Sequence, residues 1–578
     1  MKLAFTVTLF LFLSALPPGL MPVAHAAPAA PAKFIEAPPL TQVAKGAVTA
    51  CPAHDVLPLP VITWGGDIAT IHANGSQIDT ARNSLFAKSN LKVRIAREDV
   101  LSRQLENYLA CRSPFLRGTM GMLGQVAEVT DRDPRTKMVV IYQLTWSAGG
   151  DALVVKGGIK QPQDLRGKTI ALQAYGPHID YLAKVLRDSG LTFKDVTIRW
   201  VKDLTGSQDT PRAALSQAGI DAAMVIIPDA LALTSGGKVG SGAEDSVKGA
   251  RILLSTKTAN RIISDVYAVR SDFLQAHRAR VETLVRTLML AEEDLVAVFK
   301  KKGGAEYKTM IGGAAKFLLD SADAVQDTEA MYGDASFAGW RGNVAFFGDA
   351  NNPRGFAALG REIDEGLIAA GLRSKATEYA HARWDYNTLK AGLSNTAGVE
   401  APRFDAPALS QVVASRAQTD RLAEGQLFNF SVRFKPNQTT FAAAEYARDF
   451  DRAINLASTY GGAVITVEGH ADPLSYVNNK TKGEPELVLG RIRQSAKNLS
   501  LTRANAVRES VIEYAKQKGV RLDPSQLTVV GHGIDRPASG MCGADPCAPK
   551  TEAQWLSNMR VEFRIIQVEA EASVFKPN

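Results

Sequence analysis

The sequence has few cysteines, few histidines and little excess charge. Four of its 578 residues are cysteine, eight are histidine, and the formal net charge is +8. This excess is modest and spread along the chain, so we do not expect nucleic acid as a partner. Apolar residues make up 46% and charged residues 22%, as in folded soluble proteins. A chain of this length predicts two or three domains.

The sequence also lacks a long apolar run beyond its first residues, so we expect no membrane span in the mature form. At the start, Lys2 precedes an apolar run from Leu3 to Leu20, and Ala24 and Ala26 form a small-x-small cleavage site. This pattern is typical of a secretory signal peptide over residues 1–26. A membrane anchor is the alternative, and the prolines in the run and the cleavage site argue against it.

No catalytic set is present: the sequence has no nucleophile elbow, phosphate loop or paired-histidine metal motif. His470 and Asp472 lie two residues apart on a predicted strand, so they share a face and could form a catalytic pair. A family motif described below explains them better. We therefore expect a binding protein rather than an enzyme, with no cofactor and no metal.

The four cysteines predict disulfides, because an even number in an exported chain is typical of them. Cys542 and Cys547 share a turn-rich loop and form the first expected pair. A metal site there is the alternative, but no histidine lies nearby to complete the ligands. Cys51 and Cys111 form the second expected pair.

Composition and hydrophobic periodicity divide the chain. An Ala- and Pro-rich lead-in is followed by alternating strands and helices, which predict largely parallel sheets covered on both faces. The first predicted strand runs from Val61 to Trp64. A polar segment then precedes a second α/β region. The expected boundaries are signal peptide 1–26, lead-in 27–60, two-lobed domain 61–395 with its second lobe at about 152–255, linker 396–424, C-terminal domain 425–570 and tail 571–578.

Three segments of the first region carry a resemblance. They are Asp164 to Ala171, Gly219 to Val225 and Val266 to Leu274. In this order and spacing they resemble the periplasmic solute-binding proteins of the nitrate, sulfonate and thiamine-precursor type. The resemblance implies two α/β lobes, a cleft between them, a two-strand hinge and closure on a small solute.

In such a cleft, strand ends and helix N-termini can hold a polar or anionic group. Trp64 and Trp146 could instead be core aromatics, the pair Gly65-Gly66 only a turn, Asp229 an N-cap and His178 a helix-end residue. The candidate solute contacts are Trp64, Gly65, Gly66, Asp67, Thr145, Trp146, Ser147, Gln173, Tyr175, Gly176, Pro228 and Asp229.

The C-terminal region carries a second resemblance. Gly469 to Asp472, Asn498 to Val507 and Asn558 to Glu562, with Phe430 to Phe434 ahead of them, resemble the peptidoglycan-binding domain of the OmpA family. The resemblance implies that Asp472 and Arg503 hold diaminopimelate of the wall peptide, with Asn558 and Arg560 as further site residues. A carboxylate suits the ammonium of that ligand, and a guanidinium suits its carboxylate. A surface salt bridge between the two is the alternative.

The sequence departs from that family in two ways. A polar insert, Pro473 to Lys497, stands where the family has a short loop. Ala496, Trp555 and Met559 replace the family's Asn and two of its Arg residues. We expect the insert to cap or reshape the pocket.

Together these features predict an α/β protein with a two-lobed periplasmic-binding-protein fold followed by a smaller OmpA-like α/β domain. The expected function is solute binding for ABC-type uptake in a Gram-negative periplasm, with non-covalent attachment to peptidoglycan and an ABC permease as a further partner. The alternative is a wall-anchored sensor or scaffold whose lobes bind a protein.

Overall fold

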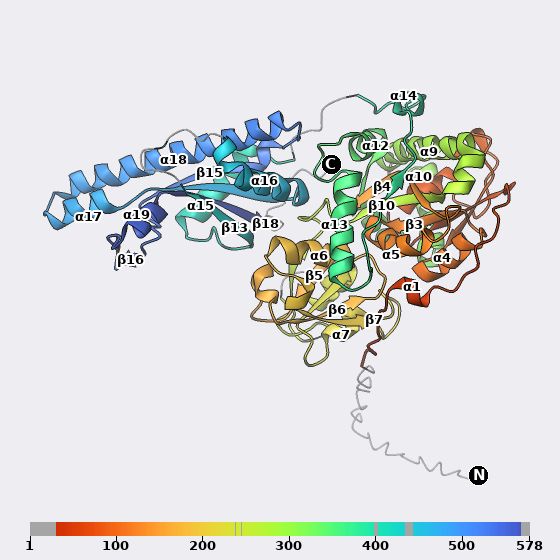
Figure 1. The fold of residues 1–578 in the computed structure, drawn as a ribbon, viewed down its shortest axis with the longest axis horizontal. Helices are drawn as coiled ribbons and strands as arrows, with labels where there is room; N and C mark the ends of the chain where they lie inside the picture. Colours follow the sequence, from red (N-terminus) through yellow and green to blue (C-terminus); the bar gives the residue numbers. More distant parts are fainter. Residues whose placement is uncertain are drawn as a thin grey trace, which may run out of the picture.

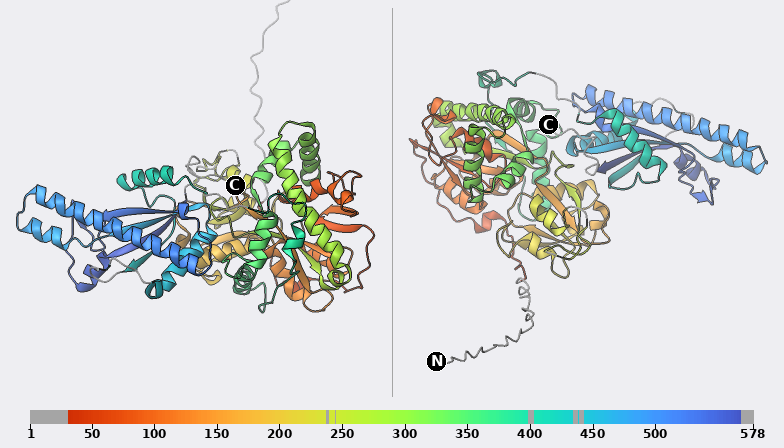
Figure 2. Two further views of the ribbon diagram at one scale, coloured as in Figure 1. Left: turned by 90° about the horizontal axis from the view of Figure 1, so that it is seen from above. Right: turned by 180° about the vertical axis from the view of Figure 1, so that it is seen from behind.

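The computed structural model describes residues 31–236, 239–243, 245–397, 403–433, 438 and 443–567. The predicted signal peptide and tail lie outside these residues. Two lobes form one body, and an elongated C-terminal domain lies beside it in all views (Figures 1 and 2). None of the helices in the described ranges has both the length and the hydropathy needed to cross a bilayer. The fold is thus α/β throughout, with an additional C-terminal α/β region, as predicted.

Lobe one contains a mainly antiparallel sheet in the order β11-β4-β10-β3, with β12 beside β4, and a separate parallel pair, β1-β2. Its strands are β1 (Leu57–Val61), β2 (Val93–Arg97), β3 (Phe115–Thr119), β4 (Met138–Ser147), β10 (Ser264–Arg270), β11 (Ala335–Phe337) and β12 (Ala380–His381). Its helices are α2 (Asp67–Ala73), α3 (Leu85–Lys88), α4 (Leu101–Leu109), α5 (Met120–Thr130), α9 (Ser271–Lys300), α10 (Ala305–Leu319), α11 (Val325–Gly333), α12 (Gly339–Gly348), α13 (Phe356–Ala369) and α14 (Tyr386–Leu389).

Lobe two has the strand order β7-β6-β8-β5-β9. Its strands are β5 (Asp151–Val155), β6 (Thr169–Gln173), β7 (Thr197–Val201), β8 (Ala222–Ile226) and β9 (Arg251–Ser255), and its helices are α6 (Ile179–Asp188), α7 (Pro211–Leu215) and α8 (Ile227–Leu233). The prediction of largely parallel sheets is wrong: β6, β7 and β8 are parallel, but β5 is antiparallel to β8 and β9. The chain crosses between the lobes from β4 to β5 and from β9 to β10, and the crossing strands run against their neighbours.

The first strand begins earlier than the sequence indicated, at Leu57 rather than Val61. Pro58 and Pro60 suggested a lead-in, yet both lie within β1. This strand pairs only with β2, so each proline can sit at an edge where no ladder donor is needed.

The residues before β1 form a strap that runs from lobe two to lobe one. The amide of Ile35 donates to the carbonyl of Trp200 on β7 (2.9 Å). The hydroxyl of Tyr175 then donates to the carbonyl of Pro38 (2.7 Å). Beyond this point α1 (Leu40–Val43) packs with α5, and Cys51 is bonded to Cys111 in lobe one. The strap therefore ties the two lobes together on one side.

Helix α13 ties them together on another side, because it packs on α5 of lobe one and on α6 of lobe two. Glycines allow the close approach. A Cβ on Gly366 would lie 2.7 Å from that of Ala183 on α6, and one on Gly124 of α5 would lie 2.8 Å from Ile363.

The C-terminal domain has a sheet in the order β13-β18-β14-β15. β14 is parallel to β15 and antiparallel to β18. Its strands are β13 (Gln426–Arg433), β14 (Ala463–His470), β15 (Leu527–Gly533) and β18 (Arg560–Gln567), with the short pair β16 (Met541–Cys542) and β17 (Asp545–Pro546). Its helices are α15 (Ala406–Gln418), α16 (Ala443–Thr459), α17 (Leu474–Thr481), α18 (Glu486–Gln517) and α19 (Glu552–Asn558).

Two regions predicted as connections are ordered helices. Within the predicted linker, Leu409 and Val413 of α15 pack with Val464 and Ile566 of the sheet. The insert after Asp472 forms α17 and the first turns of α18, which begins at Glu486 instead of near residue 498. The insert is bonded to the loop that the second disulfide, Cys542–Cys547, closes. There the carboxylate of Asp545 accepts hydrogen bonds from Tyr476 (2.8 Å) and Arg493 (3.0 Å). Both predicted disulfides are thus confirmed.

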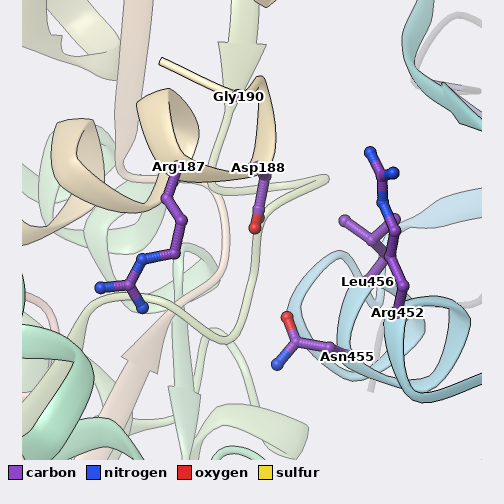
Figure 3. A pocket seen from close by; sticks show the side chains of 6 residues that line it. All are labelled: Arg187, Asp188, Gly190, Arg452, Asn455 and Leu456. Carbon is purple, nitrogen blue, oxygen red and sulfur yellow. The ribbon is translucent and has the colours of Figure 1, made fainter. Parts of the chain in front are cut away.

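The C-terminal domain contacts lobe two through α16 and α6. Nζ of Lys184 donates to Asp188 (2.8 Å) and to Asn455 (2.8 Å), and the hydroxyl of Tyr460 donates to Asp188 (2.8 Å). Beside this junction lies a hollow of about 340 Å³ between the two domains (Figure 3). Its lining residues are Arg187, Asp188, Gly190, Arg452, Asn455 and Leu456.

Candidate functional site

A buried ionic triad lies at the centre of lobe one. Arg117 on β3 donates to both carboxylate oxygens of Asp67 (3.0 and 2.7 Å) and to Asp265 on β10 (2.9 Å). Burial raises the pKa of Asp67 to about 7, against the lowering effect of the Arg117 charge. Asp67, a predicted solute contact, is therefore engaged inside lobe one.

Two further candidates continue this network toward the hinge. Nε1 of Trp64 donates to Oγ1 of Thr145 (3.0 Å), which in turn donates to Asp265 (3.1 Å). The Trp64 ring rests on the hinge backbone, where a Cβ on Gly150 would lie 2.5 Å from it. A Cβ on Gly65 would lie 1.9 Å from the carbonyl oxygen of Met331, so this close approach requires glycine.

The hinge itself is a polar cluster. Ser147 donates to Asp151 (2.6 Å), whose other oxygen contacts Nε2 of His178 (2.7 Å). Trp146 is buried edge-on against Phe346. His178, considered a helix-end residue from sequence, precedes α6 and joins the hinge to lobe two.

The other lobe-two candidates are distributed between the interface and the lobe interior. Tyr175 is held by the strap, and Oε1 of Gln173 lies against Gly176, where a Cβ would be 2.1 Å away. Asp229, which follows Pro228 at the start of α8, accepts a hydrogen bond from Arg212 on α7 (3.1 Å).

Buried polar atoms without a hydrogen-bond partner gather where the lobes meet. In the described residues they include both carboxylate oxygens of Asp180, Oε1 of Gln125, Nδ1 of His178 and Nη2 of Arg354. The two sides touch here. Nε2 of Gln125 in lobe one donates to the carbonyl of Gly176 in lobe two (3.4 Å). A buried polar group without a partner is costly, so this gathering marks a place where another molecule could supply the missing contacts.

This cost falls mainly on Asp180. Its side chain is only 5% exposed to solvent and lies in the first turn of α6, where it faces the first turn of α5. A Cβ on Gly121 of α5 would be only 2.2 Å from its Oδ1. Burial raises the pKa of Asp180 to about 7, and the negative charge of Glu362 raises it further while Arg354 lowers it. No neighbouring cation pairs with it directly in the described structure.

Sequence reasoning missed Arg117, Asp180 and Arg354. An arginine inside the apolar strand of residues 115–119 was a signal for a buried ion pair. Asp180 gave no signal, because an acid in the first turn of a helix is ordinary. Its environment comes from α5 and α13, far away in the sequence.

At the C-terminal site, Asp472 follows β14 and is half-buried. Its Oδ1 accepts from Nδ2 of Asn558 (3.2 Å) and its Oδ2 from the amide of Leu474 (2.9 Å). Burial raises its pKa. The structure therefore brings Asp472 and Asn558 together.

Arg503 lies on α18, which reaches the end of β14 because Gly469 leaves room: a Cβ there would be 2.0 Å from the carbonyl oxygen of Ser500. Nε of Arg503 donates to the carbonyl of Gln438 (3.3 Å), and burial lowers its pKa. Within the described ranges it has no carboxylate partner, so the salt bridge to Asp472 considered as an alternative does not form. Arg560 instead contacts Glu562 (2.7 Å).

Two groups in the described residues bring side chains close enough to hold a metal. In the first, Cys51, His54 and Cys111, the two cysteines are joined in a disulfide. The second consists of the buried side chains of Glu468, His470 and His532. Glu468, however, contacts His532 (2.9 Å) and Arg564 (2.7 Å), so its charge is already balanced. Burial lowers the pKa of His470 to about 2, which keeps its ring neutral. His470, two residues before Asp472, is therefore part of the buried polar network of the sheet.

Residues 86–297 match the family model described as "NMT1/THI5 like". The matched residues lie within the two lobes and make up less than half of the chain, so the match concerns that part only. No curated protein matches the chain.

The solved structures similar to this chain include periplasmic binding proteins. The aliphatic sulphonate binding protein SsuA of Escherichia coli is 16% identical over 60% of this chain and 97% of its own, with a TM-score of 0.38. The alkanesulfonate-binding SsuA of Xanthomonas axonopodis pv. citri is 16% identical over 56% and 96%, with a TM-score of 0.38. The nitrate-binding protein NrtA of Synechocystis PCC 6803 is 14% identical over 60% and 90%, with a TM-score of 0.40. Residues 86–297, within the two lobes, are the part of this chain that matches the NMT1/THI5-like family.

Proposed function

We propose that this chain is a periplasmic solute-binding protein for ABC-type uptake, attached to peptidoglycan through its C-terminal domain. The observation that carries the solute-binding part is the gathering of buried, unpartnered polar atoms between the lobes, around Asp180 and Gln125. The NMT1/THI5-like match over the same lobes supports it.

Binding requires the lobes to separate, because Gly121 and Asp180 leave no space between them. The crossings from β4 to β5 and from β9 to β10 are the natural hinge. A solute that enters the open form supplies hydrogen-bond partners to the buried groups when the lobes close, and closure excludes water from them.

The wall-binding part rests on Asp472 and Arg503. Both lie at the same end of the sheet, both are at least half-buried, and neither pairs with the other within the described residues. A carboxylate and a guanidinium that have no oppositely charged partner within the described residues match the ammonium and the carboxylate of diaminopimelate. Sedimentation of the full chain with purified sacculi tests this, and failure to co-sediment would remove the anchoring role.

A thermal-shift screen of small polar solutes tests the solute-binding part, with solution scattering of each compound that raises the melting temperature. A bound solute should change the radius of gyration as the lobes move. A broad screen with no response would remove the solute-binding role.

A second candidate, a wall-anchored scaffold with fixed lobes, is favoured by the fastenings across the lobes. The strap bonds to Trp200 on one side and to Cys111 on the other, while α13 packs on both lobes. A scaffold predicts one fixed shape in scattering and a stable protein partner instead of a small molecule.

A further inference from the structure

Asp180 presents a buried carboxylate without a cationic partner in the described structure. No side chain bonds to either of its oxygens, although the side chain is only 5% exposed. Burial raises its pKa, against the lowering effect of the backbone amides of its own helical turn, those of Asp180 and Tyr181. Buried carboxylates are ordinarily paired, since an isolated buried charge is very costly. This cost requires an explanation at the lobe interface.

The nearby charges do not supply one. The charge of Arg354 acts on Asp180, but its Nη1 donates to Glu362 (2.8 Å) and its Nε to the carbonyl of Arg261 (2.7 Å). Lys184, one turn along α6, is bound to Asp188 and Asn455. Both cations therefore bond to other partners, and Gly121 of α5 lies against the carboxylate of Asp180.

We infer that Asp180 is the counter-ion for a positively charged group on the solute. This inference rests on the proposed solute-binding function and specifies the solute class: a small molecule that carries an ammonium or amidinium group. It narrows the expectation of a polar or anionic solute at this cleft, because the carboxylate of Asp180 lies against the first turn of α5, where an anionic group of a solute would otherwise bind.

Arg354 supplies a complementary feature on the opposite side of the interface. Its Nη2 is buried without a partner. A solute with an acidic group in addition to its cation would satisfy this donor, while the cation satisfies Asp180. A zwitterion therefore fits the two unpartnered groups together better than a simple amine.

Three probes of equal carbon length separate these chemistries: propylamine, propane-1-sulfonate and 3-aminopropane-1-sulfonate. Calorimetric titration of the full chain should show binding of the amine-bearing probes, most tightly the zwitterion, and no binding of the plain sulfonate. Asp180→Asn keeps the size of the side chain and should weaken amine binding about tenfold or more. The control Asp245→Asn removes an exposed charge from the same lobe and should change nothing.

Three results would overturn the inference: tighter binding of propane-1-sulfonate than of both amines, unchanged amine binding in Asp180→Asn, or no amine binding by the wild type. The first two would leave solute binding between the lobes intact. Absence of any binding, with a scattering profile that no probe changes, would remove the proposed function as well. Because Asp180→Asn removes an unpaired buried charge, its melting temperature without a probe should equal or exceed that of the wild type, which shows that it folds.

Discussion

The lobes and the end of β14 hold their charged side chains differently. In lobe one, Arg117 is enclosed and satisfied by two aspartates from distant elements. At the end of β14, Asp472 and Arg503 have no oppositely charged partner in the described residues. The side chains of Asn558 and Trp555 and the amide of Leu474 bond to Asp472, and a backbone carbonyl accepts from Arg503. The first arrangement stabilises a fold, and the second suits a ligand. Asp180 combines features of both arrangements. It is buried, as Arg117 is, and no side chain bonds to its carboxylate.

The largest effect should come from breaking the enclosed arrangement. Arg117→Ala leaves Asp67 and Asp265 buried without a cation, which should cost about 3–5 kcal/mol of stability. Chemical denaturation of the full chain measures it. Arg94→Ala, which removes an exposed ion pair with Asp79, is the control and should leave the midpoint unchanged. A similar midpoint for both variants would show that the triad is not a structural element.

The next effect is a pH dependence due to Asp180. Its folded-state pKa of about 7 lies above the ordinary 3.8, so the folded form holds the proton more tightly. The stabilisation is fully present below about pH 4 and is lost as the pH rises to about 7, a change of up to about 4 kcal/mol. The neighbouring Glu362, whose pKa is lowered to about 2 by Arg354, Lys184 and Arg187 against the effect of burial, stays charged over this range.

Asp180→Asn should therefore remove the part of the loss that is due to Asp180, while the part due to Asp67, whose pKa burial also raises to about 7, remains. Asp245→Asn should retain both parts. Melting temperatures between pH 4 and pH 8 give the comparison. Parallel curves for Asp180→Asn and the wild type would show that Asp180 does not titrate in this window.

At the C-terminal site we expect a binding effect without a stability effect. Asp472→Ala and Arg503→Ala should each lower the affinity for sacculi about tenfold or more, because each removes a charge-assisted hydrogen bond to the wall peptide. Arg491→Ala, an exposed arginine on α18, is the control. If both site variants still bind sacculi as the wild type does, Asp472 and Arg503 are not responsible for wall binding.

The smallest effect should arise at the junction between the domains. Tyr460→Phe removes one hydrogen bond to Asp188 and should weaken the coupling of the C-terminal domain to lobe two by about 1 kcal/mol. Differential scanning calorimetry should show the two melting transitions move apart. Tyr514→Phe, whose hydroxyl bonds to Asp451 within the domain, should not separate them. Equal profiles for the two variants would argue against a coupled junction.

Local pattern was sufficient to predict the α/β class, the additional C-terminal α/β region and both disulfides. The strand that ends at His470 and the helix that carries Arg503 could be predicted, because each depends on a short motif of residues that are close in the sequence. The helical nature of the insert did not follow, since it depends on partners such as Asp545 that lie far along the chain.

The lobe interface was the least predictable part. Trp64, Asp67 and Thr145 were expected at strand ends, but their partners Arg117 and Asp265 are remote in sequence, so the network that they form did not follow from local pattern. The roles of these residues as solute contacts stay predictions. Only the folded structure shows whether a buried charged side chain has an oppositely charged partner, as Asp67 does, or has none, as Asp180 does.

Native mass spectrometry of the full chain, purified under mild conditions from the cells that export it, tests the central claim most directly. The account predicts a bound small molecule with a basic nitrogen in the wild type and its loss in Asp180→Asn, while Asp245→Asn retains it. A wild-type chain that carries no small molecule, or one that carries a protein partner instead, would contradict the account.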